Sequence, residues 1–169
     1  MEHKKLRLVL FEDCNRNCSG CCNKDWDIQN LPVCTDYSPY EMILLTGGEP
    51  MLKPDVVVQA INEIREQTDS PIILYTANLE KPLWLFLITG LIDGLTVTVH
   101  NKADAVSFMD FDKRFKPSAQ MMYKLRLNIF EEAGFVPSKP YWKVKGNMKW
   151  IPNCPLPDGE VLMRYKPKN

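Results

Sequence analysis

The sequence predicts an α/β fold with parallel strands, and two observations lead to this prediction. Strand-like apolar runs alternate with segments of helical spacing over the first 134 residues, which is the pattern of βαβ units. The chain has 169 residues, of which 45% are hydrophobic, and this suffices for one domain with an ordinary buried core. Lys and Arg total 21, equal to Asp and Glu, so the net charge indicates no partner.

Four runs rich in aliphatic and β-branched residues predict the strands of this sheet. They cover residues 6–11, 41–46, 71–76 and 94–100. In parallel sheets, ligands gather at the carboxyl ends of the strands. Polar residues that follow the third and fourth strands, Thr76, Asn78, His100 and Asn101, are therefore candidate ligand contacts, although a lone histidine more commonly has a structural role.

Helical spacing predicts three helices between and after these strands. The first starts at Pro54, where a first helical turn tolerates proline, and continues to about residue 67 with apolar residues three and four apart. A short apolar helix is expected at 81–89, closed by Gly90. Ser118 is a suitable N-cap for a third helix that ends at Gly134; its apolar stripe would consist of Met122, Leu125, Ile129, Phe130 and Ala133.

A change in composition after residue 136 divides the chain into a core, 1–136, and a proline-rich extension, 137–169. The extension contains two weaker strand candidates, 141–145 and 160–165, and is expected to complete the edge of the sheet. From Lys139 onward it carries seven Lys and Arg residues against two acidic ones. Its aromatic residues alternate with lysines, which suits either nucleotide binding or simple amphipathic strands; the second interpretation is favoured.

Three cysteines in the loop after the first strand carry the strongest chemical signal. Cys14, Cys18 and Cys21 have the spacing C-x3-C-x2-C. Three thiolates in one loop can bind three irons of a [4Fe–4S] cluster and leave the fourth iron open to a ligand. No apolar stretch predicts a signal peptide or a membrane span, so we expect a cytoplasmic protein, where cysteines indicate metal or redox chemistry before disulfides.

A second motif, Thr46-Gly47-Gly48-Glu49-Pro50, follows the second strand. Paired glycines let a backbone approach a ligand closely and offer carbonyls to an ammonium group. In this order, the two motifs resemble those of radical S-adenosylmethionine (SAM) enzymes. The resemblance covers roughly residues 6–100 and identifies the cluster loop as residues 12–27.

The resemblance implies a [4Fe–4S] cluster on Cys14, Cys18 and Cys21, and SAM as the second cofactor. It assigns Gly47, Gly48 and Glu49 to the amino group of SAM, with Thr76, Asn78, His100 and Asn101 as candidates for its ribose and carboxylate. It also implies a (β/α) barrel. Because a complete TIM barrel needs about 250 residues, we expect a truncated, laterally open partial TIM barrel of four to six parallel strands.

Residues 20–26, Gly-Cys-Cys-Asn-Lys-Asp-Trp, resemble the corresponding segment of glycyl-radical activating enzymes, in particular the small activase of anaerobic ribonucleotide reductase. This resemblance implies an oxidoreductase that takes electrons from a donor such as flavodoxin or ferredoxin and abstracts hydrogen from a partner protein. Trp26 stands one position earlier than in that group. The short interval between Cys21 and Gly47 predicts that the first crossover helix is short or missing.

Three alternatives remain open at this stage. A radical SAM enzyme that modifies a nucleotide or nucleic acid, resembling the deazaguanine synthase, would explain the basic extension. A non-catalytic module could instead bind zinc through Cys18, Cys21, Cys34 and one further thiol, or bind an Fe–S cluster without turnover. Cys22, Cys34 and Cys154 are expected to be packed thiols, and a second cluster on these three is the less favoured hypothesis.

Overall fold

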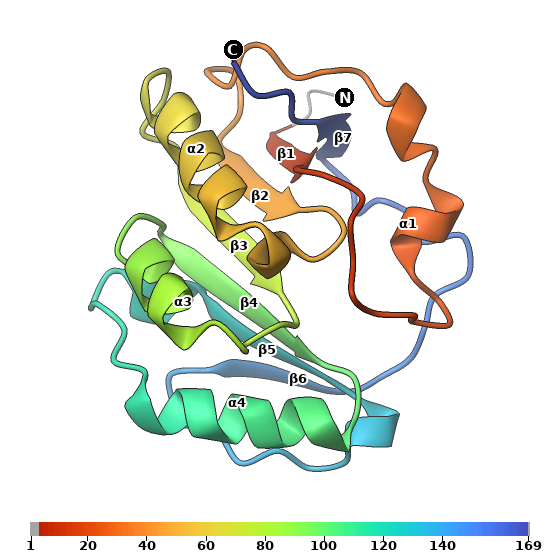
Figure 1. Cartoon of the computed structure of the whole chain (residues 1–169), viewed down its shortest axis with the longest axis vertical. Helices are drawn as coiled ribbons and strands as arrows, with labels where there is room; N and C mark the ends of the chain where they lie inside the picture. The colour runs from red at the N-terminus through yellow and green to blue at the C-terminus, as the bar shows by residue number, and fades with distance from the viewer. Residues whose placement is uncertain (1–3, 169) are drawn as a thin grey trace. The chain divides into compact units, whose positions relative to one another are not determined.

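The computed structural model describes residues 4–168. These residues divide into two compact units, each described by itself below. Within the described residues, unit 1 comprises 4–72 and 150–168, and unit 2 comprises Ile73–Lys149. Among the described residues, seven strands follow the sheet order β6-β5-β4-β3-β2-β1-β7 (Figure 1). The predicted α/β class with parallel strands is therefore confirmed, with seven strands where four to six were expected.

Unit 1 holds three neighbouring parallel strands: β1 (Lys5–Val9), β2 (Met42–Thr46) and β7 (Glu160–Arg164). β1 is central and pairs with both others. The side chains on one of its faces are completely buried, and Leu6 and Leu8 belong to this set. On the other face, Arg7 forms a salt bridge of 2.8 Å with Glu160 of β7, and both side chains are largely buried.

Helix α2 (Pro54–Arg65) of unit 1 agrees with the sequence prediction. Pro54 occupies its first turn, where its missing N–H has no helical partner to lose. The predicted apolar stripe is fully buried; it consists of Val57, Ala60, Ile61 and Ile64. The crossover between β1 and β2 contains only the four-residue helix α1 (Cys22–Asp25) and the 3-10 helix Ile28–Asn30, so the prediction of a short first crossover helix is confirmed.

Unit 2 holds β3 (Ile72–Thr76) from Ile73 onward, with β4 (Gly94–Val99), β5 (Leu125–Phe130) and β6 (Lys143–Met148). Within the unit all registered pairs are parallel. Helix α3 (Pro82–Thr89) was predicted, whereas α4 (Lys102–Arg114) was not. α4 contributes the buried rings of Phe108 and Phe111, and Phe108 packs edge-on against Trp142 at 5.3 Å.

The predicted helix at 118–134 is wrong. This segment forms the 3-10 helix Met121–Lys124, strand β5 and the 3-10 helix Glu131–Ala133. Leu125, Leu127 and Ile129 are buried while Arg126 between them is exposed, which is the period of two of a strand. The helical stripe was a coincidence of spacing, because Leu125 and Ile129, four residues apart, share a face in a strand as well as in a helix.

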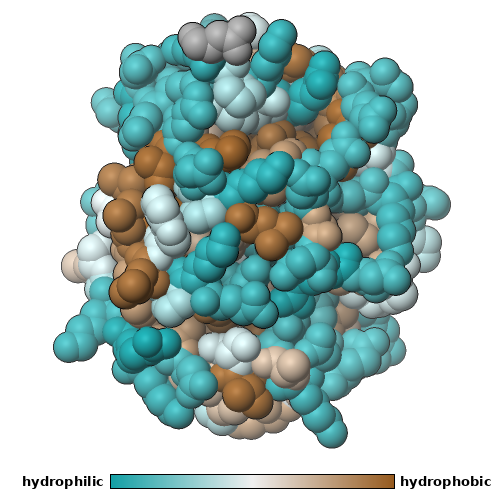
Figure 2. Space-filling view, in the orientation of Figure 1, coloured by the Kyte–Doolittle hydropathy of each residue, from teal (hydrophilic) through white to brown (hydrophobic). Residues whose placement is uncertain are grey.

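The surface carries isolated hydrophobic side chains and one concentration of them. Figure 2 shows hydrophobic atoms scattered among hydrophilic ones on the visible face. Scattered exposed apolar residues are normal in folded proteins. Helix α3 and the turn after it are different, because Leu83, Trp84, Leu87 and Leu91 are all exposed there. Among residues 4–168, no helix combines the length and the apolar character that crossing a membrane requires.

Candidate functional site

Backbone hydrogen bonds join the two sequence motifs within unit 1. The parallel pairing of β1 with β2 continues beyond the strands, as Leu10 donates to the carbonyl of Thr46 at 2.9 Å. Gly48 then donates to the carbonyl of Phe11 at 2.7 Å, and Glu49 donates to that of Asp13 at 2.8 Å. The beginning of the cluster loop is therefore fixed directly on the glycine segment.

The two glycines permit this close approach of backbone to backbone. A Cβ atom on Gly47 would lie 2.6 Å from the carbonyl oxygen of Phe11, and one on Gly48 would lie 1.9 Å from that of Asp13. Gly47 also has φ of +139°, which side chains rarely adopt. The sequence suggested that a ligand demands these glycines. The structure shows that the chain's own residues 11–13 already demand them, and a SAM contact stays a prediction.

Glu49 and Lys53 support the contact between the cluster loop and the glycine segment. The Glu49 side chain is 3% exposed and accepts a hydrogen bond of 3.1 Å from the N–H of Met51, so it caps the 3-10 helix Pro50–Leu52. Lys53 forms a salt bridge with Asp13, and its Nζ lies 5.1 Å from the centre of the Phe11 ring. Both contacts hold the cluster loop to the segment that follows β2.

The three cysteines of the motif are accessible to different degrees. Cys14 is exposed, and Cys18 and Cys21 are half-buried. Partial burial raises the pKa of the Cys14 thiol above its ordinary value, and the charges of Glu49 and Cys21 raise it further, although the N–H of Arg16 opposes this by a hydrogen bond. Within residues 4–168, no three Cys, His, Asp or Glu side chains converge into a group that could hold a metal.

Lys24 shapes the cluster loop from helix α1. Its Nζ donates to the carbonyl of Cys18 at 2.9 Å and to Oδ1 of Asn17 at 3.4 Å. Its backbone N–H donates to the carbonyl of Cys21 at 3.0 Å. The Asn-Lys pair that resembles the activating enzymes thus has a local role, because it closes the loop that carries the three motif cysteines.

Cys22 and Cys154 form a disulfide with a Cα–Cα distance of 5.2 Å, and this corrects the expectation that both are separate thiols. The peptide carbonyl of Cys154 accepts a hydrogen bond of 3.1 Å from the indole N–H of Trp26. Trp150 lies against Gly20, because a Cβ added to Gly20 would be 2.5 Å from the Cβ of Trp150. The segment that starts at Trp150 therefore packs on the cluster loop, which sequence spacing could not indicate.

Cys34 is a buried thiol, 5% exposed, whose Sγ donates to the carbonyl of Asp36 at 3.4 Å. Burial raises its pKa to about 11. With Cys22 bonded to Cys154, a second cluster on Cys22, Cys34 and Cys154 does not form. Outside the disulfide, three cysteines lie in the cluster loop and the fourth is packed in the core. The residue type of these three fits a [4Fe–4S] cluster, although their side chains do not converge in this structure.

The four candidates in unit 2 have structural partners. Oγ1 of Thr76 accepts from the N–H of Asn78 at 3.1 Å, and Oδ1 of Asn78 accepts from the N–H of Glu80 at 2.9 Å, so this pair closes the turn after β3. Both side chains are buried. Their proposed contact with SAM is a prediction that these hydrogen bonds do not test.

His100 and Asn101 form the start of helix α4. Asn101 is the N-cap, and its side chain accepts from the N–H of Asp104 at 3.0 Å. Asp104 accepts in turn from the N–H of His100 at 2.9 Å, and the His100 ring lies 4.9 Å from that of Phe130. This pair of reciprocal contacts is a capping arrangement, and it was the missed sequence signal for α4.

Two of the aromatic residues of the extension are buried. Trp142 and Tyr165 are 4% and 5% exposed. The indole N–H of Trp142 donates to Asp112 at 2.8 Å. These two rings belong to the core and lie just outside β6 and β7, so the interpretation as amphipathic strands stays a prediction.

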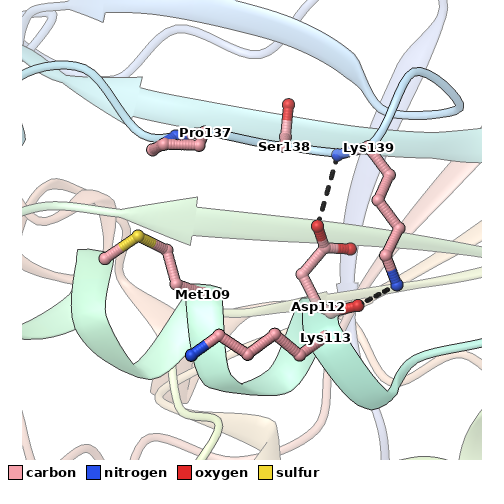
Figure 3. A pocket seen from close by; sticks show the side chains of 6 residues that line it. All are labelled: Met109, Asp112, Lys113, Pro137, Ser138 and Lys139. Carbon is pink, nitrogen blue, oxygen red and sulfur yellow. Dashed lines mark hydrogen bonds between the residues drawn. The ribbon is translucent and has the colours of Figure 1, made fainter.

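A pocket of about 300 Å³ in unit 2 is part of the same packing. Figure 3 shows Asp112 of α4 directed at Lys139, whose backbone N–H donates to its carboxylate at 3.2 Å. Lys139 Nζ also donates to the peptide carbonyl of Asp112. The bonds between Asp112 and Lys139 therefore join α4 to the loop before β6 beside this pocket.

Two comparisons with known proteins complete this description. No model of a protein family matches the sequence, and no curated protein matches it.

Proposed function

We propose that the chain is a radical SAM enzyme in which Cys14, Cys18 and Cys21 hold a [4Fe–4S] cluster. In this proposal, Gly47, Gly48 and Glu49 receive the amino group of SAM. One observation carries the proposal: the cysteine loop and the glycine segment, separated in sequence, are bonded backbone to backbone in unit 1. A zinc module has no need of such a junction.

The bound cluster would supply the electron that cleaves SAM to methionine and a 5′-deoxyadenosyl radical, which abstracts hydrogen from a substrate. The chain's own residues prepare the site. Lys24 closes the cluster loop, and the disulfide removes Cys22 from the set of available ligands. In the same proposal, the open parallel sheet is a laterally open partial TIM barrel, and Thr76, Asn78, His100 and Asn101 serve the ribose and carboxylate of SAM.

The proposed substrate is a partner protein, as in the glycyl-radical activating enzymes, with flavodoxin or ferredoxin as electron donor. Residues 20–26 support this class by their resemblance. The exposed apolar side chains of α3 and of the turn after it support a protein partner. Leu83 and Leu87 lie four residues apart on α3 and are 82% and 52% exposed, and Leu91 in the turn is 39% exposed. Contiguous exposed apolar surface is typical of protein interaction sites.

The test is anaerobic reconstitution with iron and sulfide, followed by SAM and dithionite. The expected product is 5′-deoxyadenosine in the wild-type protein and in Cys34→Ala, whose substituted thiol lies outside the loop. Cys14→Ala should form none. Equal product in Cys14→Ala and wild type, or none in any of the three with iron bound, would reject the radical SAM proposal.

A further inference from the structure

One face of the sheet in unit 2 carries polar and basic side chains in two rows. Each row crosses three strands, from β4 through β5 to β6, and its members are registered partners. Alternate residues of a strand share a face, and so do registered partners in a parallel pair. We call these six residues the basic face: Thr96, Thr98, Arg126, Asn128, Lys143 and Lys145.

The intervening residues of β4 and β5 point to the opposite face and form the core of the unit. Leu95, Val97, Leu127 and Ile129 are all buried there. On the basic face, Thr96 is 2% exposed, Thr98 and Asn128 are half-buried, and the three cations are exposed. The basic face thus combines less exposed, uncharged hydrogen-bonding groups with three exposed positive charges.

The three cations of the basic face are uncompensated. Within residues 4–168, Arg126, Lys143 and Lys145 form no ion pair. The next charges after these strands, Glu131 and Lys149, bind each other at 3.1 Å. The basic face therefore presents three positive charges and no negative one, an arrangement that attracts anions.

Asn128 adds an observation of a different kind. Its Oδ1 atom is buried and has no hydrogen-bond partner. Because Oδ1 only accepts hydrogen bonds, a water molecule or a donor group would satisfy it, whereas the amide N–H₂ of the same side chain is the group that can donate to an anion. The position is central, because Asn128 lies between Thr98 and Lys145 in its row.

Size and charge define the ligand. Three strands span about 10 Å and two residues along a strand span about 7 Å, so the basic face suits a small molecule rather than a length of nucleic acid. SAM itself does not suit it, because the sulfonium and ammonium groups leave SAM with a net positive charge. Guanidinium and ammonium groups together with hydroxyls are the donors that bind phosphate.

We propose that the basic face of unit 2 binds a small anion that bears phosphate groups. This site goes beyond the proposed radical chemistry and does not depend on it. Arg126 would bind two phosphate oxygens at once, and the two lysines would neutralise the remaining charge. The hydroxyl of Thr98 and the amide N–H₂ of Asn128 would donate hydrogen bonds to the ligand.

Isothermal titration calorimetry of the protein as isolated, with inorganic pyrophosphate as probe, tests this site. We expect one saturable site per chain, with affinity about three- to tenfold weaker in each of Arg126→Gln, Lys143→Gln and Lys145→Gln. Lys116→Gln is the matched control, because Lys116 is also exposed in unit 2 but lies outside the sheet, and it should bind as wild type does. The far-ultraviolet circular dichroism spectrum verifies that each variant is folded.

Three results would overturn the proposal. The first is no saturable pyrophosphate binding, and the second is equal weakening by Lys116→Gln. The third is malonate or a single-stranded 12-mer binding more tightly than pyrophosphate, which would replace phosphate by carboxylate or by nucleic acid. Because no cluster or SAM is added, failure here leaves the deoxyadenosine test unaffected, and the reverse also holds.

Discussion

Gly47 and Gly48 show how single residues bring two motifs together. Each is placed where any side chain would collide with the backbone of residues 11–13. Their positions were predicted from sequence as part of a ligand site, but the contact that requires them is internal. Glycine can be required by a ligand or by an internal backbone contact. Sequence alone does not distinguish these causes, because both select glycine at the same position.

Replacing Gly48 by alanine should destabilise the protein, because the new Cβ would meet the carbonyl of Asp13, a backbone atom that cannot rotate away. We expect a loss of about 2–4 kcal/mol in the free energy of unfolding, measured by urea denaturation. Gly146→Ala is the control, since nothing lies within 4 Å of its Cβ position, and it should change stability by less than about 1 kcal/mol. Similar effects of the two substitutions would contradict the packing described for Gly48.

Cys34 predicts a pH dependence of stability. Burial raises its pKa from an ordinary value of 9.0 to about 11 in the folded protein, so the folded state retains a proton that the unfolded state loses. Its stabilising contribution is complete below pH 9 and is lost as pH rises through about 11. Between pH 8 and pH 11, the free energy of unfolding of Cys34→Ala should therefore fall by about 2 kcal/mol less than that of wild type. If urea denaturation shows the same loss of unfolding free energy in both proteins between the two pH values, this thiol is not responsible for the pH dependence.

At the scale of elements, the sequence predicted the strands and helices of the first hundred residues closely. Each has a strong local pattern, such as the stripe of α2 after Pro54. The failure after residue 101 has a local cause too. The capping contacts of Asn101 and Asp104 were overlooked, so α4 was missed. The apolar residues of β5 were then assigned to a helix, because one set of positions satisfied two periods.

Cys22 and Cys154 link the extension to the cluster loop covalently. This disulfide closes a loop of 132 residues, and removal of such a link increases the entropy of the unfolded chain. Without reductant, Cys154→Ser should unfold with about 2–4 kcal/mol less free energy than wild type, by urea denaturation. Reductant should lower the free energy of unfolding of wild type toward that of Cys154→Ser, and it should leave the value for Cys154→Ser unchanged.

Cys34→Ala provides the comparison for that experiment. Because its disulfide is intact, it should keep the sensitivity to reductant that Cys154→Ser loses. A wild-type protein that responds to reductant no more than Cys154→Ser does would contradict the described bond.

For the molecule as a whole, the class of fold was predictable and the sheet order was not. Alternating patterns indicate parallel strands wherever they occur. Pairing between distant segments, such as Lys5 with Glu160, has no local signal. β6 and β7 come from proline-rich sequence with weak patterns, yet they form the two ends of the sheet order.

The candidate site divides in the same way. The cysteine and glycine motifs were located from their spacing, and the structure joins them within unit 1. The packing of Trp150 and Cys154 on the cluster loop could not be predicted, because it joins segments more than 100 residues apart. The basic face was equally hidden, since its three cations align only when β5 and β6 are in register.

The most direct measurement for the central claim is electron paramagnetic resonance of the reconstituted, dithionite-reduced protein, before and after addition of SAM. The account predicts about four irons per chain and the signal of a reduced [4Fe–4S] cluster, with g-values that change when SAM binds. A protein that takes up zinc in place of iron, or a cluster signal that SAM leaves unchanged, would contradict it.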